Sequence, residues 1–522
     1  MRSIQTAAAT GVPRLTKLVS TIGPASEEAE PLEGCVAAGM DVMRVNFSHA
    51  TVDEFHLRRT NLRAAPGGKY VSVMLDTKGP EIRMGGLRVC KETGNRKAKM
   101  MLTAGETLTL TNDKAYDGDG DERTIYVGYD RLTEILSAGD KVLLDDGLVS
   151  LVVTDVSEKG VEAEVLNSSE IGERKGVNLP GIATGLPAMS EKDLEDIRFG
   201  IEHDIDMIAA SFVRNAAGVH EIREHVYACH ERYAGEDFFM VPPPLIISKI
   251  ESTEALENLQ EIIEASDGIM VARGDLGVEI PLDQVVTWQK DMVALCIAAG
   301  KPVIVATQML ETMQKNPRPT RAEIADVTNA VLDGADCVML SGESANGQFP
   351  IESVETQSDI CLSAEGWAKE RGLSCAADIH GMTSSEEDAA EGDFTDSVSA
   401  AACFLADRIN AAAVVVIEEG FGEMARAVSK HRPPIPIIAI SDCLKVCRQL
   451  SISRGVYPQL FEGDDMEENG LAEMSADRAC ELGVMADLLK PGDTAVVVFG
   501  NGITVEMIED MDELDGFGED DK

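Results

Sequence analysis

Residues 246–275 read IISKIESTEALENLQEIIEASDGIMVARGD and contain two short apolar runs, Ile246–Ile250 and Gly268–Ala272. A polar stretch of helical character lies between the runs, and charged residues follow each of them. Two buried strands joined by a crossover helix form a βαβ unit, in which the strands are parallel. This stretch therefore predicts an α/β fold with a parallel sheet.

The same alternation extends to both sides of this stretch. The runs that we interpret as strands are Leu18–Ser20, Val42–Val45, Val71–Leu75, Met207–Ala210, Ile246–Ile250, Gly268–Ala272, Val303–Ala306 and Cys337–Leu340. Helix starts are expected at Ser26, at Ser190, which forms a capping box with Asp193, and at Thr320, before a stretch that ends at Gly334. Eight consecutive βα units predict a (β/α)₈ TIM barrel.

One connection in this series is much longer than the others, because about 130 residues separate Leu75 from Met207. Between about Met84 and Leu186 the pattern changes to short alternating runs with Asp-Gly turns. These runs are Glu106–Thr111, Lys141–Leu144 and Leu148–Thr154. We expect an inserted small β-barrel domain that acts as a lid over one mouth of the barrel.

The barrel pattern ends after Gln357, and an acidic stretch, Ser384–Asp393, precedes a second αβ series. Its strands, Ala413–Ile417, Pro436–Ile440 and Thr494–Phe499, predict an open-sheet α/β domain. The predicted organisation is a flexible N-terminus (1–13), a barrel (14–84 and 187–357), a lid (85–186), a C-terminal regulatory or assembly domain (358–508) and an acidic tail (509–522).

The charge of the chain excludes some partners. Its 522 residues include 91 acidic and 46 basic side chains, which gives a formal net charge of −45. Such a chain repels nucleic acid and anionic lipid, and no run of 18 apolar residues predicts a membrane span. The excess acid indicates either an ordinary solvated surface or adaptation to a salty cytosol.

The cysteines favour a reducing compartment. There are 11, an odd number spread over the chain, and the Cys443–Cys447 spacing fits a helical turn better than a metal site. We expect free thiols in a cytoplasmic protein. Residues 1–16 lack acidic side chains, so import into an organelle is the alternative to a flexible N-terminus.

Polar residues gather at the predicted strand ends, where the active site of a TIM barrel lies. They are Arg44, Asn46, Ser48 and His49 at the second strand, Asp76, Thr77 and Lys78 at the third, Lys249 and Glu251 at the fifth, Arg273, Gly274 and Asp275 at the sixth, Thr307 and Gln308 at the seventh, and Ser341 and Glu343 at the eighth. Because Lys249 and Glu251 are two residues apart on a strand, their side chains are expected to point the same way.

Two ion sites are candidates within this set. Glu251 and Asp275, with no His or Cys nearby, favour Mg²⁺, while Lys249 faces an anionic ligand. The alternative is a structural salt bridge between Lys249 and one of these acids. A second group offers short oxygen-bearing side chains and one formal charge, which suits a monovalent cation or, alternatively, a hydrogen-bond network. It consists of Asn46, Ser48, Asp76 and Thr77.

Several longer segments resemble the corresponding segments of the pyruvate kinase family. They are Thr16–Ser26, Met43–His49, Leu75–Arg83, Lys175–Gly181, Ile247–Glu251, Gly268–Gly277 and Ala306–Leu310, all in the family's order. The resemblance implies a barrel, a lid and a C-terminal domain. It also implies phosphoryl transfer from phosphoenolpyruvate to ADP, giving pyruvate and ATP, and assembly as a homotetramer.

The resemblance assigns roles to the barrel residues. Glu251 and Asp275 would hold Mg²⁺ (or Mn²⁺), with Gly274 and Asp275 also touching the substrate. Lys249 would stabilise the transferring phosphoryl group, Arg44 would bind its oxygens, and Thr307 would help to protonate enolpyruvate. The implied nucleotide contacts are Asn46, Phe47, Ser48, His49, Arg83 and Lys175.

The family's K⁺ ligands match Asn46, Ser48, Asp76 and Thr77. Glu81 matters as well, because in this family Glu at this position accompanies K⁺ dependence, whereas Lys supplies the charge itself. In the C-terminal domain the chain departs from relatives that fructose 1,6-bisphosphate activates: the phosphate loop reads Glu418–Glu423 with three carboxylates, and the later loop Gly500–Thr504 is short. We therefore expect no activation by this sugar phosphate.

Two other functions compete with this interpretation. A metal-dependent lyase or aldolase acting on pyruvate also places Glu and Asp at the strand ends of a barrel, but it needs neither Arg83 nor Lys175 for a nucleotide. A non-catalytic regulatory relative is the second alternative. The presence of every core side chain argues against it.

Overall fold

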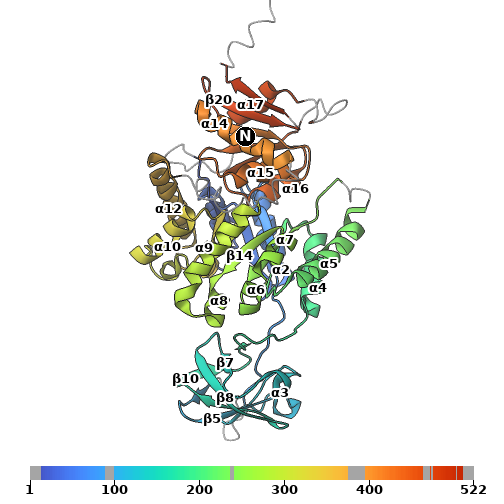
Figure 1. Ribbon diagram of the computed structural model, residues 1–522, viewed down its shortest axis with the longest axis vertical. Coiled ribbons are helices and arrows are strands. Elements are labelled where there is room, and N and C mark those ends of the chain that lie inside the picture. Colours follow the sequence, from blue (N-terminus) through green and yellow to red (C-terminus); the bar gives the residue numbers. More distant parts are fainter. Residues whose placement is uncertain are drawn as a thin grey trace, which may run out of the picture.

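The computed structural model describes residues 13–88, 99–235, 240–373, 394–462, 471, 474–500 and 502–509. The chain forms three units in a row, with the lid at one end, the barrel in the middle and the C-terminal domain at the other end (Figure 1). The predicted acidic stretch Ser384–Asp393 and nearly all of the predicted N-terminal and C-terminal tails lie outside the described residues. The precise domain boundaries stay predictions.

The barrel is a closed parallel sheet in the order β1-β16-β15-β14-β13-β12-β3-β2. Its strands are β1 (Lys17–Thr21), β2 (Val42–Asn46), β3 (Ser72–Asp76), β12 (Met207–Ala210), β13 (Leu245–Ile250), β14 (Gly268–Ala272), β15 (Val303–Ala306) and β16 (Cys337–Leu340). All eight predicted strands are confirmed to within two residues at each end. Each is a β-branched or otherwise apolar run buried on both faces, as expected of parallel strands covered by helices.

Helices connect the barrel strands. They are α1 (Ala29–Ala37), α2 (Val52–Ala64), α4 (Glu191–Glu202), α5 (Ala216–Ala234), α6 (Thr253–Glu257), α7 (Leu259–Ala265), α8 (Arg273–Glu279), α9 (Leu282–Ala298), α10 (Arg321–Leu332), α11 (Gly342–Ala345) and α12 (Pro350–Glu370), with a 3₁₀ turn at η3 (Glu311–Gln314). The predicted caps at Ser190 and Thr320 are confirmed as capping boxes. The predicted cap at Ser26 is wrong, because Ser26 closes a buried turn with Gly23 and α1 begins only at Ala29.

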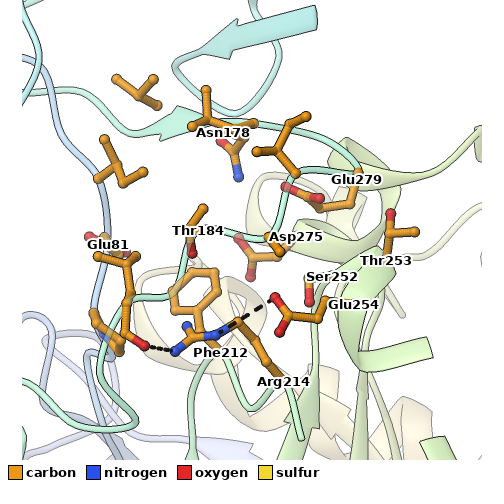
Figure 2. Close-up of a pocket in the computed structure, with 18 of the residues that line it drawn as sticks. Glu81, Asn178, Thr184, Phe212, Arg214, Ser252, Thr253, Glu254, Asp275 and Glu279 are labelled. Carbon is orange, nitrogen blue, oxygen red and sulfur yellow. Dashed lines mark hydrogen bonds and ion pairs between the residues drawn. The ribbon is translucent and has the colours of Figure 1, made fainter. Parts of the chain in front are cut away.

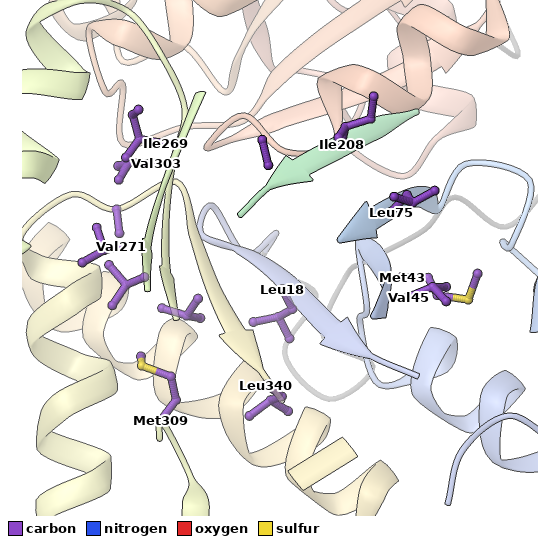
Figure 3. Packing of buried hydrophobic residues seen from close by; sticks show 14 of the residues in the cluster. Leu18, Met43, Val45, Leu75, Ile208, Ile269, Val271, Val303, Met309 and Leu340 are labelled. Carbon is purple, nitrogen blue, oxygen red and sulfur yellow. The ribbon is translucent and has the colours of Figure 1, made fainter. Parts of the chain in front are cut away.

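Packing on the two faces of the barrel follows the alternation of the strands. One set of side chains, including Val19, Met270 and Ile304, fills the interior. The neighbouring residues point outward and pack under the helices, as Figure 3 shows for Leu18 and Val271. This double burial makes the barrel a rigid frame for the polar residues at its rim.

The insertion between β3 and α4 is the predicted lid. Its strands are β4 (Lys99–Leu102), β5 (Thr107–Thr111), β6 (Thr124–Tyr126), β7 (Lys141–Leu144), β8 (Val149–Ser157), β9 (Gly160–Val165), β10 (Ser169–Gly172) and β11 (Val177–Asn178), with η1 (Lys114–Tyr116) and α3 (Leu132–Ile135). Six strands form a curled sheet in the order β11-β7-β8-β9-β5-β6, and β10 pairs with β4. One apolar core holds both sheets together.

The C-terminal domain is an open sheet in the order β19-β18-β17-β20-β21, in which only β21 is antiparallel. Its elements are α14 (Phe394–Ile409), β17 (Ala413–Ile417), α15 (Glu423–Lys430), β18 (Ile437–Ser441), α16 (Leu444–Leu450), β19 (Val456–Leu460), α17 (Ala476–Met485), β20 (Thr494–Phe499) and β21 (Gly502–Met507). The three predicted strands are confirmed. The sheet also contains β19 and β21, which the sequence pattern missed.

The C-terminal domain packs against the amino ends of the barrel strands. Ser72 at the start of β3 lies 2.6 Å from Ser451, measured between the hydroxyl oxygens, and Cys337 at the start of β16 donates to the Ile452 carbonyl at 3.1 Å. The lid is inserted at the opposite, carboxyl end (Figure 1). The barrel rim that carries the predicted site therefore faces the lid.

Candidate active site

Lys249 lies at the centre of a polar cluster at the carboxyl ends of the barrel strands. Its Nζ is 2.9 Å from Glu251 Oε1 and 3.3 Å from Asp76 Oδ1, and it donates to Ser211 Oγ at 2.8 Å. The 2.9 Å contact confirms that Lys249 and Glu251 point the same way from β13. Burial favours a lower pKa for Lys249, but the two carboxylates outweigh it and raise the pKa above its ordinary value. The two carboxylates therefore favour the charged form of this amino group.

Arg44 brings a second cation to the same carboxylate. Its Nε lies 2.6 Å from Asp76 Oδ2, and its guanidinium also donates to Thr21 Oγ1 at 2.7 Å. Asp76 is almost fully buried; burial favours a higher pKa, yet Arg44 and Lys249 lower it below the ordinary value. The charged carboxylate of Asp76 therefore holds both cations at the rim.

Glu251 and Asp275 come together from adjacent strands. Asp275 lies in the first turn of α8, directly after β14, and β14 pairs with β13. Burial and the neighbouring Glu251 raise the pKa of Asp275 to about 8. Glu251 is only 1 % exposed, and its Oε2 accepts from the Phe212 amide at 2.6 Å.

Two carboxylates that resist joint ionisation provide a favourable environment for a cation. Their oxygen atoms suit Mg²⁺, which also takes water and substrate oxygens as ligands. Among the described residues no group of three or more His, Cys, Asp or Glu side chains is arranged as a metal centre. Glu251 and Asp275 therefore fit a Mg²⁺ ion that substrate and water oxygens complete.

The loop after β15 has a constrained backbone. Thr307 has a φ of 76°, which is unusual for a β-branched residue, and Gln308 has a φ of 57°. The Arg273 guanidinium fixes this loop by donating to the carbonyl of Thr307 at 2.7 Å and to that of Ala306 at 3.0 Å. A Cβ atom at Gly274 would lie 3.0 Å from Thr307 Cγ2, so the glycine allows the two backbones to approach closely. Thr307, Gly274 and Asp275 therefore share one part of the rim.

Ser211 belongs to the same cluster and was missing from the sequence prediction. It directly follows β12, accepts from Lys249, donates to the Thr77 carbonyl at 2.7 Å and lies 3.3 Å from Asp76 Oδ1. Its position immediately after a predicted strand was the signal available in the sequence.

The stretch after β2 divides between the core and the surface. Asn46 Oδ1 accepts from the Ser48 amide at 3.0 Å, and His49 is exposed. The ring of Phe47 is only 3 % exposed and packs against Phe55, with the centroids 5.8 Å apart. The Phe47 side chain is therefore part of the core, and only its backbone can face a ligand.

The four predicted K⁺ ligands come from adjacent strand ends. Asn46 is the register partner of Asp76, and Thr77 follows Asp76. Thr77 Oγ1 accepts from the Ser211 amide at 3.1 Å. The oxygens of Asp76 and Thr77 therefore take part in the hydrogen-bond network that was the structural alternative for this group.

Arg83 and Lys175 mark the two crossings between barrel and lid. The two segments that carry them are adjacent, because the Met84 amide donates to the Lys175 carbonyl at 2.9 Å. Lys175 Nζ lies 2.9 Å from Asp145 Oδ1 of the lid, and Arg83 donates to Glu81 Oε2 at 2.6 Å. Both cationic side chains are more than 40 % exposed and thus available to a ligand.

A cavity of about 160 Å³ opens between the lid and the rim. Figure 2 shows Asp275 and Glu279 of α8 facing Asn178 and Thr184 of the segment that returns from the lid. Lid and barrel thus form the walls of this cavity. Lys249, Glu251 and Arg44 do not line it, and Asp275 connects it to the polar cluster. No described helix is long and apolar enough to span a membrane.

The fold and the polar cluster are those of a TIM-barrel enzyme, with the candidate active site on the rim that faces an inserted lid. Residues 13–354 match the family model for the pyruvate kinase barrel domain, and residues 396–510 match that for the pyruvate kinase alpha/beta domain. The chain belongs to the pyruvate kinase family, whose members are phosphotransferases.

Individual relatives agree with this assignment. A pyruvate kinase of Sporosarcina psychrophila is 43% identical over 449 residues, covering 85% of this chain and 71% of the relative. Pyruvate kinase PKLR of Homo sapiens is 39% identical over 503 residues, covering 93% and 82%. The crystal structure of a pyruvate kinase from Cryptosporidium parvum superposes with a TM-score of 0.85 at 38% identity, covering 95% of this chain and 96% of the other.

Proposed function

We propose that this protein transfers the phosphoryl group of phosphoenolpyruvate to ADP and releases pyruvate and ATP. The observation that carries the proposal is the Lys249 amino group, held beside Glu251 and Asp76 at the rim of a pyruvate kinase barrel. Phosphoryl transfer needs alignment and neutralisation of charge more than covalent help. A buried cation beside a pair of acids supplies such an environment.

Glu251 and Asp275 would hold Mg²⁺, or Mn²⁺, against the carboxylate and phosphate of phosphoenolpyruvate. The metal, when bound, neutralises charge on the substrate. Lys249 faces the transferring phosphoryl group, and Arg44 binds its oxygens. The backbone at Gly274 and Asp275 adds substrate contacts.

Thr307 would position the proton donor that converts enolpyruvate to pyruvate. Its carbonyl is fixed by Arg273, and its side chain lies next to Gly274. The site thus separates two tasks on the rim. Lys249 acts on the phosphoryl group, and Thr307 acts on the carbon that accepts the proton.

The nucleotide would lie on the other side of the rim. Asn46, Phe47 through its backbone, Ser48 and His49 would contact ADP or ATP, together with Arg83 and Lys175. Support comes from the exposure of Arg83 and Lys175 where the chain crosses between barrel and lid. A lyase or aldolase would have no use for these two cations, and the family assignment leaves that alternative without support.

K⁺ would bind Asn46, Ser48, Asp76 and Thr77, and Glu81 predicts that activity depends on it. K⁺ binding requires oxygens of Asp76 and Thr77 that accept hydrogen bonds from protein groups in this structure to coordinate the ion as well. We expect activity to fall steeply when K⁺ is replaced by tetramethylammonium. Undiminished activity would refute the K⁺ site.

Fructose 1,6-bisphosphate is not expected to activate the enzyme. The buried Glu418 carboxylate accepts from the amides of Gly420 at 3.3 Å and Ala425 at 3.0 Å, so an internal anion occupies the donors that a phosphate would need. A dose response in initial velocity would overturn this expectation.

We also propose a cytoplasmic homotetramer. Large apolar side chains on the C-terminal domain support assembly, since Phe404 on α14 is 69% exposed and Met507 on β21 is 73% exposed. Light scattering at micromolar concentration measures the mass. A monomer would contradict the proposal.

The principal test is ADP-dependent formation of pyruvate from phosphoenolpyruvate, with Mg²⁺ and K⁺ present and Lys249→Met as the matched variant. Active wild type and an inactive variant support the kinase. Equal inactivity of the two, with both folded, would favour the non-catalytic relative.

A further inference from the structure

We propose that Arg214 is a positioning residue that fixes the lid to the barrel rim for nucleotide binding, an inference that rests on the proposed function. The segment 179–189, here called the return hinge, leads from β11 of the lid to α4 of the barrel. It contains no helix or strand, so its carbonyl groups need partners outside regular structure.

Arg214 supplies partners for two of these carbonyl groups. Its guanidinium donates to the carbonyls of Leu186 and Pro187, the latter at 2.9 Å, and Figure 2 shows it between the return hinge and Glu254. The Nε atom lies 4.0 Å from Glu254 Oε2, and the side chain is only 13% exposed. One partly buried cation thus binds two consecutive carbonyls of the return hinge.

The barrel holds Arg214 firmly. The Asn258 side chain donates to the Arg214 carbonyl at 2.9 Å, and the Ala216 amide donates to Glu261 Oε1 at 3.0 Å. Asn258 and Glu261 belong to the α6–α7 segment that follows β13. Because this segment of the barrel fixes Arg214, the contacts of Arg214 fix the return hinge relative to the barrel and not only relative to the loop 211–214.

The same loop also reaches the acidic pair. Phe212, two residues before Arg214, has a φ of 54°, and its amide donates to Glu251 Oε2 at 2.6 Å. A loop of four residues after β12, 211–214, thus contacts Lys249, Glu251 and the return hinge. This arrangement sets the lid relative to the substrate groups at the rim.

The consequence differs for the two substrates. The proposed phosphoenolpyruvate contacts all lie on the barrel, whereas Lys175 lies on the lid side of the return hinge. Loosening the hinge displaces Lys175 relative to Arg44 and Lys249. Arg214 is therefore expected to act on the KM for ADP and not on the binding of phosphoenolpyruvate.

The test compares Arg214→Met with the wild type. Loss of a partly buried charged donor is expected to raise the KM for ADP about tenfold while the KM for phosphoenolpyruvate stays within about twofold. Hydrogen exchange of the amides in 179–189 of the unliganded protein is expected to accelerate by about tenfold. Arg214→Lys, which keeps the charge but loses the planar fork, should give an intermediate KM for ADP.

Arg223→Met is the matched control, because Arg223 makes similar contacts away from the lid, to Asp267 at 3.0 Å and to the Ala265 carbonyl at 2.7 Å. It should leave exchange in 179–189 unchanged. Equal rises in both KM values for Arg214→Met, or unchanged exchange in the hinge, would overturn the positioning role. An inactive wild type would refute the kinase proposal instead, while the exchange measurement still tests the contacts of Arg214 with the return hinge.

Discussion

The two ends of the barrel both bury charged side chains, but they pair them differently. At the amino end the Asp336 carboxylate accepts four hydrogen bonds, two from Arg432 and one each from the amides of Val303 and Arg454. At the carboxyl end Glu251 Oε1 has no hydrogen bond, although Lys249 lies nearby. Both oxygens of Asp336 therefore accept hydrogen bonds, whereas Glu251 retains one oxygen that no hydrogen bond satisfies.

The difference reflects what each end contacts. Asp336 belongs to the barrel and Arg432 to the C-terminal domain, so their ion pair at 2.6 Å connects the two units. The rim places Glu251 beside Asp275, and burial together with this neighbouring acid raises the pKa of Asp275 to about 8. The repulsion between two neighbouring carboxylates destabilises the fold, and a bound cation removes this repulsion. A barrel can thus use one end for assembly and the other for chemistry.

The largest expected effect is a loss of activity from a substitution at the carboxyl end of the barrel. Lys249→Met should lower kcat by about 10⁴-fold, since it removes the cation that faces the transferring group. Thermal unfolding and initial-rate assays on the same preparation measure both quantities. The surface variant Lys290→Met should keep full activity. A Lys249→Met enzyme with more than a tenth of the wild-type kcat would contradict the assignment of chemistry to this end.

The reverse pattern is expected at the amino end. Arg432→Met leaves the buried Asp336 carboxylate without its cation and should reduce the free energy of unfolding by about 4 kcal/mol. Molecules that remain folded should retain the wild-type KM for phosphoenolpyruvate. Urea titration measures the loss, with Arg478→Met as an exposed control that should cost less than about 0.5 kcal/mol. A loss no greater than that of the control would show that this ion pair does not hold the domains together.

Lys17 is another buried charge at the amino end, and it is less well paired than Asp336. Its side chain is 1% exposed, its Nζ lies 3.9 Å from Asp41 Oδ1 and 4.0 Å from the centroid of the Tyr457 ring, and it has no hydrogen-bond acceptor among the described residues. Burial lowers the pKa of Lys17 to about 8. The folded chain therefore releases this proton at a lower pH than the unfolded chain does.

The sign of the pH effect follows from this order. Between pH 8 and the ordinary lysine pKa the unfolded state binds more protons, so raising the pH stabilises the fold. Relative to Lys17→Met, the wild type should gain about 3 kcal/mol over this interval. Urea titrations at a series of pH values measure the difference. A flat difference would show that the pKa of Lys17 is the same in the folded and the unfolded state.

Burial patterns made the barrel predictable from sequence. Runs such as Gly268–Ala272 are apolar throughout because both faces of a barrel strand are covered. The two strands of the C-terminal sheet that were missed, β19 and β21, lack such a continuous apolar run. β19 contains Pro458 and Gln459 and is partly exposed, and β21 is an edge strand with alternating exposure.

The part of the candidate site that could be predicted from the sequence is the part whose charged side chains lie on or directly after strands. Lys249 and Glu251 follow from a two-residue spacing, but the loop after β12 does not, because its contacts use backbone groups. Phe212 binds Glu251 through an amide, and Arg214 binds carbonyls 27 and 28 residues away. Such contacts depend on backbone geometry and leave no charge pattern in the sequence.

The smallest effect concerns Ser211, which that loop brings to the rim. Ser211→Ala removes the hydroxyl that accepts from Lys249, and the lost hydrogen bond to a charged group should lower kcat about tenfold. Ser429→Ala is the matched change at the amino end, where Ser429 donates to the Arg454 carbonyl at 2.7 Å. It should cost about 1 kcal/mol of stability and leave kcat unchanged. If both variants lose stability alone, Ser211 serves the fold and Lys249 is positioned by its two carboxylates without it.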